Sequence, residues 1–157
     1  MRRNDREVTD LDEQLDIIRR CDVCRLAFYD TEAPYIVPMN FGFEWIDGTL
    51  VLYFHSSNSG EKLERMAAHP QVGFEMDCSH RLLEAEKACN YSMEYESIIG
   101  RGFAKLVADD QKLHALTCIM RQYHAEESYS FDPRMVKAVT VFQVTASAFT
   151  AKRLQKH

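Results

Sequence analysis

Residues 35–57 read YIVPMNFGFEWIDGTLVLYFHSS. The first part, Tyr35–Trp45, is rich in the aromatic and β-branched residues that favour strands. Asp47-Gly48 is a turn dipeptide, and the run Leu50–Phe54 that follows it is apolar on both faces. The segment therefore predicts a hairpin whose second strand lies in the middle of a sheet and is covered on both sides.

Four further stretches on either side of this hairpin have the composition of strands: Val23–Tyr29, Gln71–Cys78, Tyr95–Val107 and Val139–Phe149. Most connections are too short for parallel crossovers, so the six strands are expected in antiparallel order. Closing such a sheet removes its exposed edges. We therefore expect a mainly β protein with helices (α+β), a six-stranded antiparallel barrel that is closed or nearly so.

The remaining segments predict three helices and one irregular stretch. A first helix is expected over residues 9–20, where a capping-box pattern precedes apolar residues at helical spacing. A short helix follows Gly60, and a longer one is expected after a cap at Asp109. Residues 79–93 are polar and read as irregular. Gly100 and Gly102, within a long strand, indicate a bend or a close approach to something bound.

Length and charge narrow the classes of function. Residues 1–157 have the length of one domain. Nineteen basic and 24 acidic residues give a net charge of −5, which lacks the positive excess that a nucleic-acid backbone requires. The start is polar, and no apolar run approaches the ~18 residues of a membrane span. We expect a cytoplasmic protein with neither nucleic acid nor membrane as a partner.

The five cysteines are an odd number in a chain with no export signal, so they are expected to be reduced thiols. Cys21 and Cys24 form a CxxC pair, but it leads from a helix into a strand, whereas redox motifs need a strand-to-helix context. Cys78, His80 and Cys89 lack a fourth ligand and match no common zinc spacing. The sequence therefore predicts neither a redox motif nor a metal site.

The junction at residues 53–63 is the stretch best suited to chemistry, because it places Ser56, Ser57, Ser59, Gly60 and Lys62 where a strand leads into a helix. Helix N-termini present free N–H groups and partial positive charge, so this composition suits a phosphate. The alternative is structural: a serine caps the helix and the lysine is solvated. Spacing alone does not decide between them.

Three blocks of the chain occur together in one order: residues 35–43 (YIVPMNFGF), residues 52–56 with 60–63 (LYFHS and GEKL), and residues 95–102 (YESIIGRG). This order resembles the nitroimidazole-resistance branch of the pyridoxamine 5′-phosphate oxidase-like flavoproteins over nearly the whole chain. Several blocks in one order are more specific than any single short motif. The resemblance implies a split-barrel fold of the FMN-binding type, a homodimer, and FMN in a groove shared by both subunits.

The resemblance also implies which residues hold FMN. Those contacts are Val37, Pro38, Met39 and Asn40 along the isoalloxazine and ribityl chain, His55 and Ser56 near the ribityl-phosphate end, Lys62 at the phosphate, and Ser97 from the other subunit.

Two positions depart from the oxidases of this group. Tyr35 and Glu61 stand where those proteins have arginines that contact phosphate. Because guanidinium groups bind phosphate through paired hydrogen bonds, their loss counts against tight FMN binding and against oxidation of pyridoxamine phosphate. Glu61 also places a negative charge beside Lys62.

The resemblance as a whole leads us to expect an FMN-dependent oxidoreductase that reduces a small-molecule electrophile such as a nitro compound. His55 is the candidate catalytic residue, since an imidazole near a flavin can donate a proton or hold an anionic substrate. A structural histidine at the end of a strand is the alternative. Two other functions stay open: a non-catalytic flavin- or haem-binding or sensing protein, and a dimeric structural domain with an empty groove.

Overall fold

The computed structural model describes residues 4–126 and 128–155. Its strands are β1 (Glu7–Val8), β2 (Cys24–Phe28), β3 (Tyr35–Met39), β4 (Gly42–Ile46), β5 (Thr49–Ser57), β6 (Gln71–Leu83), β7 (Ser92–Leu106) and β8 (Val139–Leu154). Its α-helices are α1 (Leu11–Arg20), α2 (Glu61–Ala68), α3 (Lys112–Tyr123) and α4 (Pro133–Lys137). Short 3₁₀ turns cover Asn4–Arg6, Ala88–Asn90 and Asp109–Gln111.

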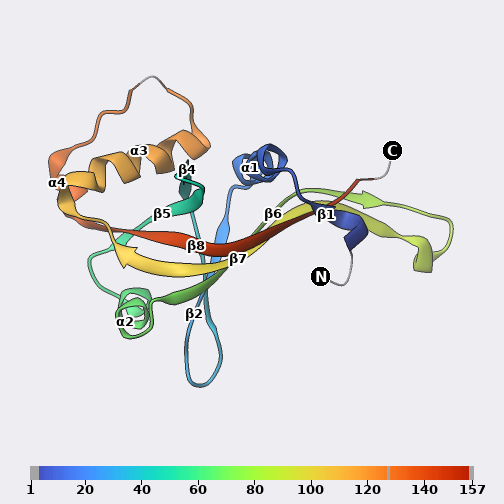
Figure 1. The fold of residues 1–157 in the computed structure, drawn as a ribbon, viewed down its shortest axis with the longest axis horizontal. Helices are drawn as coiled ribbons and strands as arrows, with labels where there is room; N and C mark the ends of the chain where they lie inside the picture. Colours follow the sequence, from blue (N-terminus) through green and yellow to red (C-terminus); the bar gives the residue numbers. More distant parts are fainter. Residues whose placement is uncertain (1–3, 127, 156–157) are drawn as a thin grey trace.

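All eight strands belong to one antiparallel sheet with the order β3-β2-β6-β7-β8-β5-β4, and β1 pairs with β8. In Figure 1 α1 and α3 lie above the long strands and α2 lies below them. The β6–β7 hairpin extends away from the helices toward the right of that view. The expected mainly β, antiparallel architecture is confirmed.

The two ends of the strand order, β3 and β4, follow each other in the chain and are joined by Asn40 and Phe41 alone. The sheet therefore curls until its ends meet at this corner. No pairing joins β3 to β4 among the residues that the structure describes. The barrel is split rather than closed.

Two differences make eight strands where six were expected. The single strand expected over Tyr35–Trp45 is broken at Asn40–Phe41, because the amide of Phe41 donates to the Tyr123 hydroxyl (2.9 Å) and its ring is fully buried. The second addition, β1, has only two residues, too few to show a periodic pattern.

The expectation of irregular chain over residues 79–93 is wrong at both ends of that segment, while residues 84–91 form no strand. β6 continues to Leu83 and pairs with the start of β7, so this segment forms the end of a hairpin. The pairing register shifts between Cys78 and Arg81, and Ser79 takes a positive φ of 59°. Such a bulge interrupts the alternation by which a strand is recognised in a sequence.

β5 is buried on both faces, as its composition predicted. Leu50, Leu52 and Phe54 join the main core, where the Phe54 and Phe142 rings stack at 5.2 Å. Val51 and Tyr53 point the other way, into a smaller cluster beneath α3. Because side chains alternate along a strand, β5 contributes residues to the main core on one face and to the cluster beneath α3 on the other.

The three predicted helices begin close to their predicted positions, whereas α4 was not predicted. α1 starts after Asp10, whose carboxylate accepts from the Glu13 amide (3.0 Å), so the cap is Asp10 and not Thr9. Asp109 lies in a 3₁₀ turn instead of capping α3, which begins at Lys112. None of the described helices combines the length and the apolar character that crossing a bilayer requires.

The two glycines of β7 make room for the chain itself. A Cβ at Gly100 would lie 2.1 Å from the Phe74 ring, and one at Gly102 would lie 2.3 Å from the Thr145 carbonyl oxygen. The close approach that these glycines predicted is thus made by neighbouring strands.

The C-terminal end of α3 fastens the open corner of the sheet. The Tyr123 hydroxyl accepts from the Phe41 amide and donates to the Asp22 carbonyl (2.8 Å). The side-chain amide of Gln122 donates to the carbonyls of Ile18 (3.0 Å) and Cys21 (2.7 Å). One helix end thereby joins the α1–β2 connection to the junction of β3 and β4.

A buried carboxylate joins the far end of the sheet to α1. Glu96 of β7 accepts from Arg20 (2.9 Å to each oxygen), Arg153 (2.6 Å) and Ser79 (2.8 Å). Burial alone would raise the pKa of Glu96, but the hydrogen bonds from Arg20, Arg153 and Ser79 outweigh it and lower the pKa. We call these four residues the Glu96 cluster.

Candidate functional site

The junction between β5 and α2 brings a lysine onto a buried hydroxyl. The Lys62 ammonium donates to Ser56 Oγ at 3.0 Å, and Ser56 is buried. Gly60, in the left-handed region with φ 137°, precedes the helix without a side-chain cap, so Ser59 does not cap it. A cation and a hydroxyl therefore stand together beside the first turn of a helix, the setting that suits an anion.

Arg65 supplies positive charge close to Tyr35 and Glu61, the two positions where the resemblance leads one to expect arginines. Its guanidinium carbon lies 4.9 Å from the centre of the Tyr35 ring. It also pairs with Asp30 (2.7 Å) and Glu61 (2.5 Å). Hydrogen bonds from Arg65 lower the pKa of Asp30. Sequence analysis missed Arg65, although its i,i+4 spacing from Glu61 is a signal of this pair.

We call Ser56, Glu61, Lys62 and Arg65 the α2 corner. Both carboxylates beside Arg65 already neutralise its charge, whereas Lys62 has a neutral hydroxyl as its partner. Of the two cations, Lys62 is therefore the one whose charge is left for a ligand.

His55 and Ser56 point to opposite faces of β5, because successive side chains of a strand alternate. Ser56 is buried beneath Lys62, and His55 is exposed. The two residues that sequence analysis placed at one end of the ligand therefore do not share a face.

Val37, Pro38, Met39 and Asn40 lie on or directly after an end strand of the sheet. Val37 and Met39 pack against the main core, while Pro38 and Asn40 are exposed. β3 pairs on one side with β2, and on its other side no described strand pairs with it. The outer edge of β3 is thus open to a ligand or to another chain.

Ser97 lies far from the α2 corner. On the shared neighbour β8, Ser56 is paired with Thr140 and Ser97 with Lys152. At about 3.3 Å per residue these twelve positions separate the two serines by about 35–40 Å along the sheet. Within one chain, Ser97 therefore lies outside the α2 corner.

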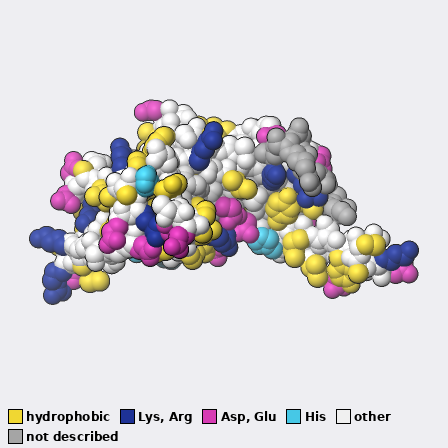
Figure 2. Space-filling view, turned by 90° about the horizontal axis from the view of Figure 1, so that it is seen from below, with side chains coloured by type: hydrophobic (Ala, Val, Ile, Leu, Met, Phe, Trp, Pro, Cys, Tyr) yellow, Lys and Arg dark blue, Asp and Glu magenta, His cyan; other side chains and the backbone are white. Residues whose placement is uncertain are grey.

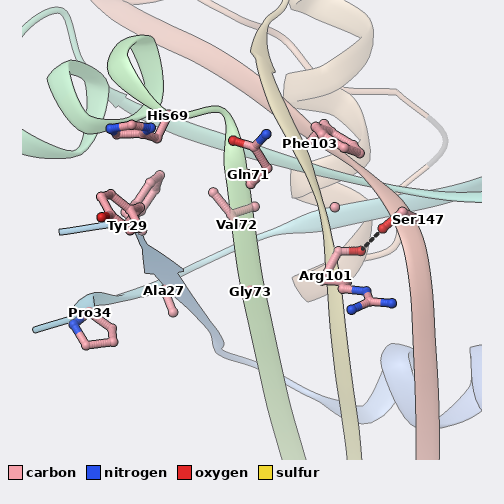
Figure 3. A pocket seen from close by; sticks show the side chains of 12 residues that line it. Ala27, Tyr29, Pro34, His69, Gln71, Val72, Gly73, Arg101, Phe103 and Ser147 are labelled. Atoms are coloured by element: carbon pink, nitrogen blue, oxygen red, sulfur yellow. Dashed lines mark hydrogen bonds between the residues drawn. The ribbon is translucent and has the colours of Figure 1, made fainter. Parts of the chain in front are cut away.

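A hollow of about 770 Å³ opens on the sheet across β2, β6, β7 and β8. In Figure 3 Tyr29, Pro34 and His69 form one side, Val72 and Gly73 the middle, and Arg101 and Phe103 the other side. The Tyr29 and His69 rings lie 4.6 Å apart. None of the eight residues predicted to hold FMN lines this hollow, so it is a separate feature of the single chain.

The five cysteines are free thiols, and all except Cys89 are buried. Burial, more than any neighbouring charge, raises the pKa of the Cys21, Cys24 and Cys118 thiols, for Cys118 to about 12. The thiolate is the reactive form. Cys21 and Cys24 therefore lack the low thiol pKa on which a CxxC redox motif depends.

Comparison with known proteins identifies the family. The model of the pyridoxamine 5′-phosphate oxidase family matches residues 10–153. The chain belongs to this family. Among solved structures, a protein of Bacteroides thetaiotaomicron named for resistance to 5-nitroimidazole antibiotics is 34% identical, with a TM-score of 0.78. The match covers 94% of this chain and 86% of that one, which confirms the predicted resemblance.

Two more distant members of this fold carry names that mention cofactors. The flavocytochrome Anf3 of Azotobacter vinelandii is 17% identical with a TM-score of 0.80, over 99% of this chain and 72% of that one. A FAD- and haem-binding protein of Mycobacterium smegmatis is 17% identical with a TM-score of 0.82, over 96% and 74%. At this identity they show the shared fold alone. No curated protein sequence matches the chain.

Proposed function

We propose that this member of the pyridoxamine 5′-phosphate oxidase family binds FMN in a groove shared by two copies and reduces a small electrophile. The contact of Lys62 with Ser56 carries the proposal. An ammonium, a hydroxyl and a helix N-terminus are the donors that a phosphate monoester needs. Membership of this family favours a flavin as the molecule that bears the phosphate.

The separation of the α2 corner from Ser97 supports a site shared between subunits, because their pairing partners lie twelve residues apart on β8, about 35–40 Å of strand. Ser97 and the exposed Ile99 share one face of β7, so an apolar contact there brings Ser97 to the second copy. Figure 2 shows further hydrophobic side chains on the arm at right, where the β6–β7 hairpin exposes Leu82, Tyr91 and Met93. Light scattering at micromolar concentration should report twice the chain mass; a stable monomer would contradict the shared groove.

A bound flavin supplies two-electron redox chemistry. In this proposal Lys62 and Ser56 hold the phosphate, the edge of β3 from Val37 to Asn40 positions the ring system, and Ser97 closes the site from the partner. The exposed imidazole of His55 donates a proton to the substrate or holds its negative charge. His55→Gln should then lower turnover of a nitro compound and, because His55 faces away from Ser56 and Lys62, should weaken FMN binding much less than Lys62→Ala does.

The proposal is tested by comparing FMN with riboflavin, which lacks the phosphate. A charge-assisted hydrogen bond contributes about 1.5–3 kcal/mol, so Lys62→Ala should weaken FMN binding about 10- to 100-fold and leave riboflavin binding almost unchanged. Lys112→Ala, at a partly exposed lysine of α3 outside both the α2 corner and the β6–β7 hairpin, is the matched control. Equal FMN affinity in wild type and Lys62→Ala would place the phosphate elsewhere.

A non-catalytic protein that holds a flavin or a haem is the second candidate. It is favoured by Tyr35 and Glu61, which replace two phosphate-binding arginines and leave Lys62 as the uncompensated cation of the α2 corner. The absorbance spectrum of the purified protein distinguishes a flavin from a haem. Reduction of a nitro compound by the loaded protein, with a nicotinamide donor, separates the reductase from the non-catalytic protein.

A further inference from the structure

A second cluster of reactive side chains lies on the other side of β5, beneath α3. His114 Nε2 is 2.7 Å from Glu44 Oε2 and 3.6 Å from Cys118 Sγ. Among the residues that the structure describes, Glu44, His114 and Cys118 are the one group of three such side chains whose ligand atoms all lie within 4.8 Å of one another. The flavin proposal uses none of them.

Packing of the backbone fixes the position of this cluster. A Cβ at Gly42 would lie 2.3 Å from the Cys118 carbonyl carbon, so β4 contacts α3 there at the closest distance that glycine permits. Two residues along β4 cover about 6.7 Å, and four residues along α3 cover about 6 Å. Glu44, two positions after Gly42 on the same face, therefore meets His114, one helical turn before Cys118.

The distances suit a tetrahedral ion. Zinc bonds of about 2.0–2.1 Å to nitrogen and 2.3 Å to sulfur place those two atoms about 3.5 Å apart in tetrahedral geometry. The 3.6 Å between His114 Nε2 and Cys118 Sγ already matches this separation. The carboxylate oxygen lies 2.7 Å from the nitrogen and needs to withdraw by about 0.7 Å, to the roughly 3.4 Å of a tetrahedral site, which a rotation of the Glu44 side chain allows.

The solvent exposure of the three side chains and their contacts with neighbouring residues also suit a metal site. Cys118 is buried, whereas the side chains of His114 and Glu44 are 49% and 27% exposed, so an ion reaches them from solvent. The Tyr53 hydroxyl donates to the same Glu44 oxygen at 3.1 Å, and its ring meets the His114 ring edge to face at 6.1 Å. Outer partners of this kind orient metal-binding side chains.

We propose that Glu44, His114 and Cys118 bind one Zn²⁺ ion, with water completing the tetrahedron. One thiolate, one imidazole and one carboxylate form a ligand set that zinc accepts, and three protein ligands leave the fourth position open. The sequence did not predict this site, because Glu44 precedes His114 by 70 residues.

Protein treated with a chelator is titrated with Zn²⁺ and, separately, with Co²⁺, whose thiolate charge-transfer absorbance reports a Cys ligand. One equivalent per chain is expected, and Glu44→Gln, His114→Gln and Cys118→Ser should each weaken binding by more than the 10- to 100-fold typical of losing an outer partner. Tyr53→Phe, at an outer partner, should weaken it about 10-fold. Zinc at about 100 times its Kd should raise the melting temperature of wild type by about 5–10 °C.

Two controls match the ligands. His124→Gln removes an exposed histidine that also lies 2.7 Å from a carboxylate, that of Glu126, and Cys89→Ser removes an exposed thiol; both should leave zinc binding unchanged. A Co²⁺ spectrum without a thiolate band, or one that Cys118→Ser leaves intact, overturns the proposal. If Cys118→Ser does not fold, Glu44→Gln and His114→Gln test the proposal, because both residues are partly exposed. Zinc affinity that neither of these two variants changes would also overturn the proposal.

Discussion

The α2 corner and the Glu96 cluster are both groups of cations and carboxylates, but they are built in opposite ways. The α2 corner draws Ser56, Glu61, Lys62 and Arg65 from ten consecutive residues, and its Glu61–Arg65 pair lies at the surface. The Glu96 cluster joins β7 to residues 76 and 57 positions away, and the Glu96 side chain is only 10% exposed.

This difference indicates which group is free to bind a ligand. Breaking a buried pair leaves a charge without water or partner, so the Glu96 cluster is costly to rearrange. Exposed pairs contribute little to stability because water replaces either partner. The α2 corner can therefore reorganise its contacts around an anion, while the Glu96 cluster keeps α1, β7 and β8 together.

The largest expected effect is on stability, when glutamate is replaced by glutamine in each group separately. Glu96→Gln leaves Arg20 and Arg153 without their common carboxylate and should lower the free energy of unfolding by about 2–4 kcal/mol, since both arginines keep some access to water. Glu61→Gln should lower it by less than about 1 kcal/mol. Urea unfolding at pH 7 measures both, and equal losses would contradict the comparison.

Acid should remove the contribution of the Glu96 cluster to stability. Because the pKa of Glu96 is lowered in the folded protein, the unfolded chain binds more protons below the ordinary value of 4.5. The stability from Glu96 is therefore present above pH 4.5 and is lost as pH falls through its lowered pKa. The difference in unfolding free energy between wild type and Glu96→Gln should shrink below pH 4.5. A difference that stays constant down to pH 2 would show that Glu96 does not titrate in this way.

The smallest effect concerns ligand binding at the α2 corner. Within the proposed function, Glu61→Gln removes a negative charge beside Lys62 and leaves Arg65 with Asp30 alone. At about 1 kcal/mol or less, this should tighten FMN binding up to about fivefold, more at low salt, without affecting riboflavin. Fluorescence titrations at two salt concentrations measure the change. Weaker FMN binding would mean that Glu61 holds Arg65 in a position that the ligand needs.

Features that depend on neighbouring residues could be predicted from the sequence. The burial of both faces of β5 follows from Leu50–Phe54, and the contact of Lys62 with Ser56 follows from a strand that leads directly into a helix. Arg65 lay within reach of the same reasoning. The break at Asn40–Phe41 could not be predicted in this way, because its cause is Tyr123, 82 positions away in the chain.

The Glu96 cluster and the Glu44–His114–Cys118 group were missed for a related reason. Each depends on which strand or helix packs beside which, and the pairing of β7 with β8 follows from no local pattern. The bulge at Ser79 adds a register shift that alternation cannot reveal. The resemblance predicted Ser97 as a cofactor contact, but its separation from Ser56 along the sheet becomes evident only from the pairing of both β5 and β7 with β8.

The hydroxyl of Tyr123, shared by Phe41 and Asp22, makes the Phe41 amide a reporter for one specific motion. The Phe41 amide proton is hydrogen-bonded to a side chain at the end of α3 and not to a neighbouring strand. It therefore exchanges with solvent when the helix end lifts from the corner between β3 and β4. Its exchange rate measures how often the split in the barrel widens, separately from unfolding of the sheet. Asn40 precedes this amide directly, so a ligand lying along β3 would slow the exchange.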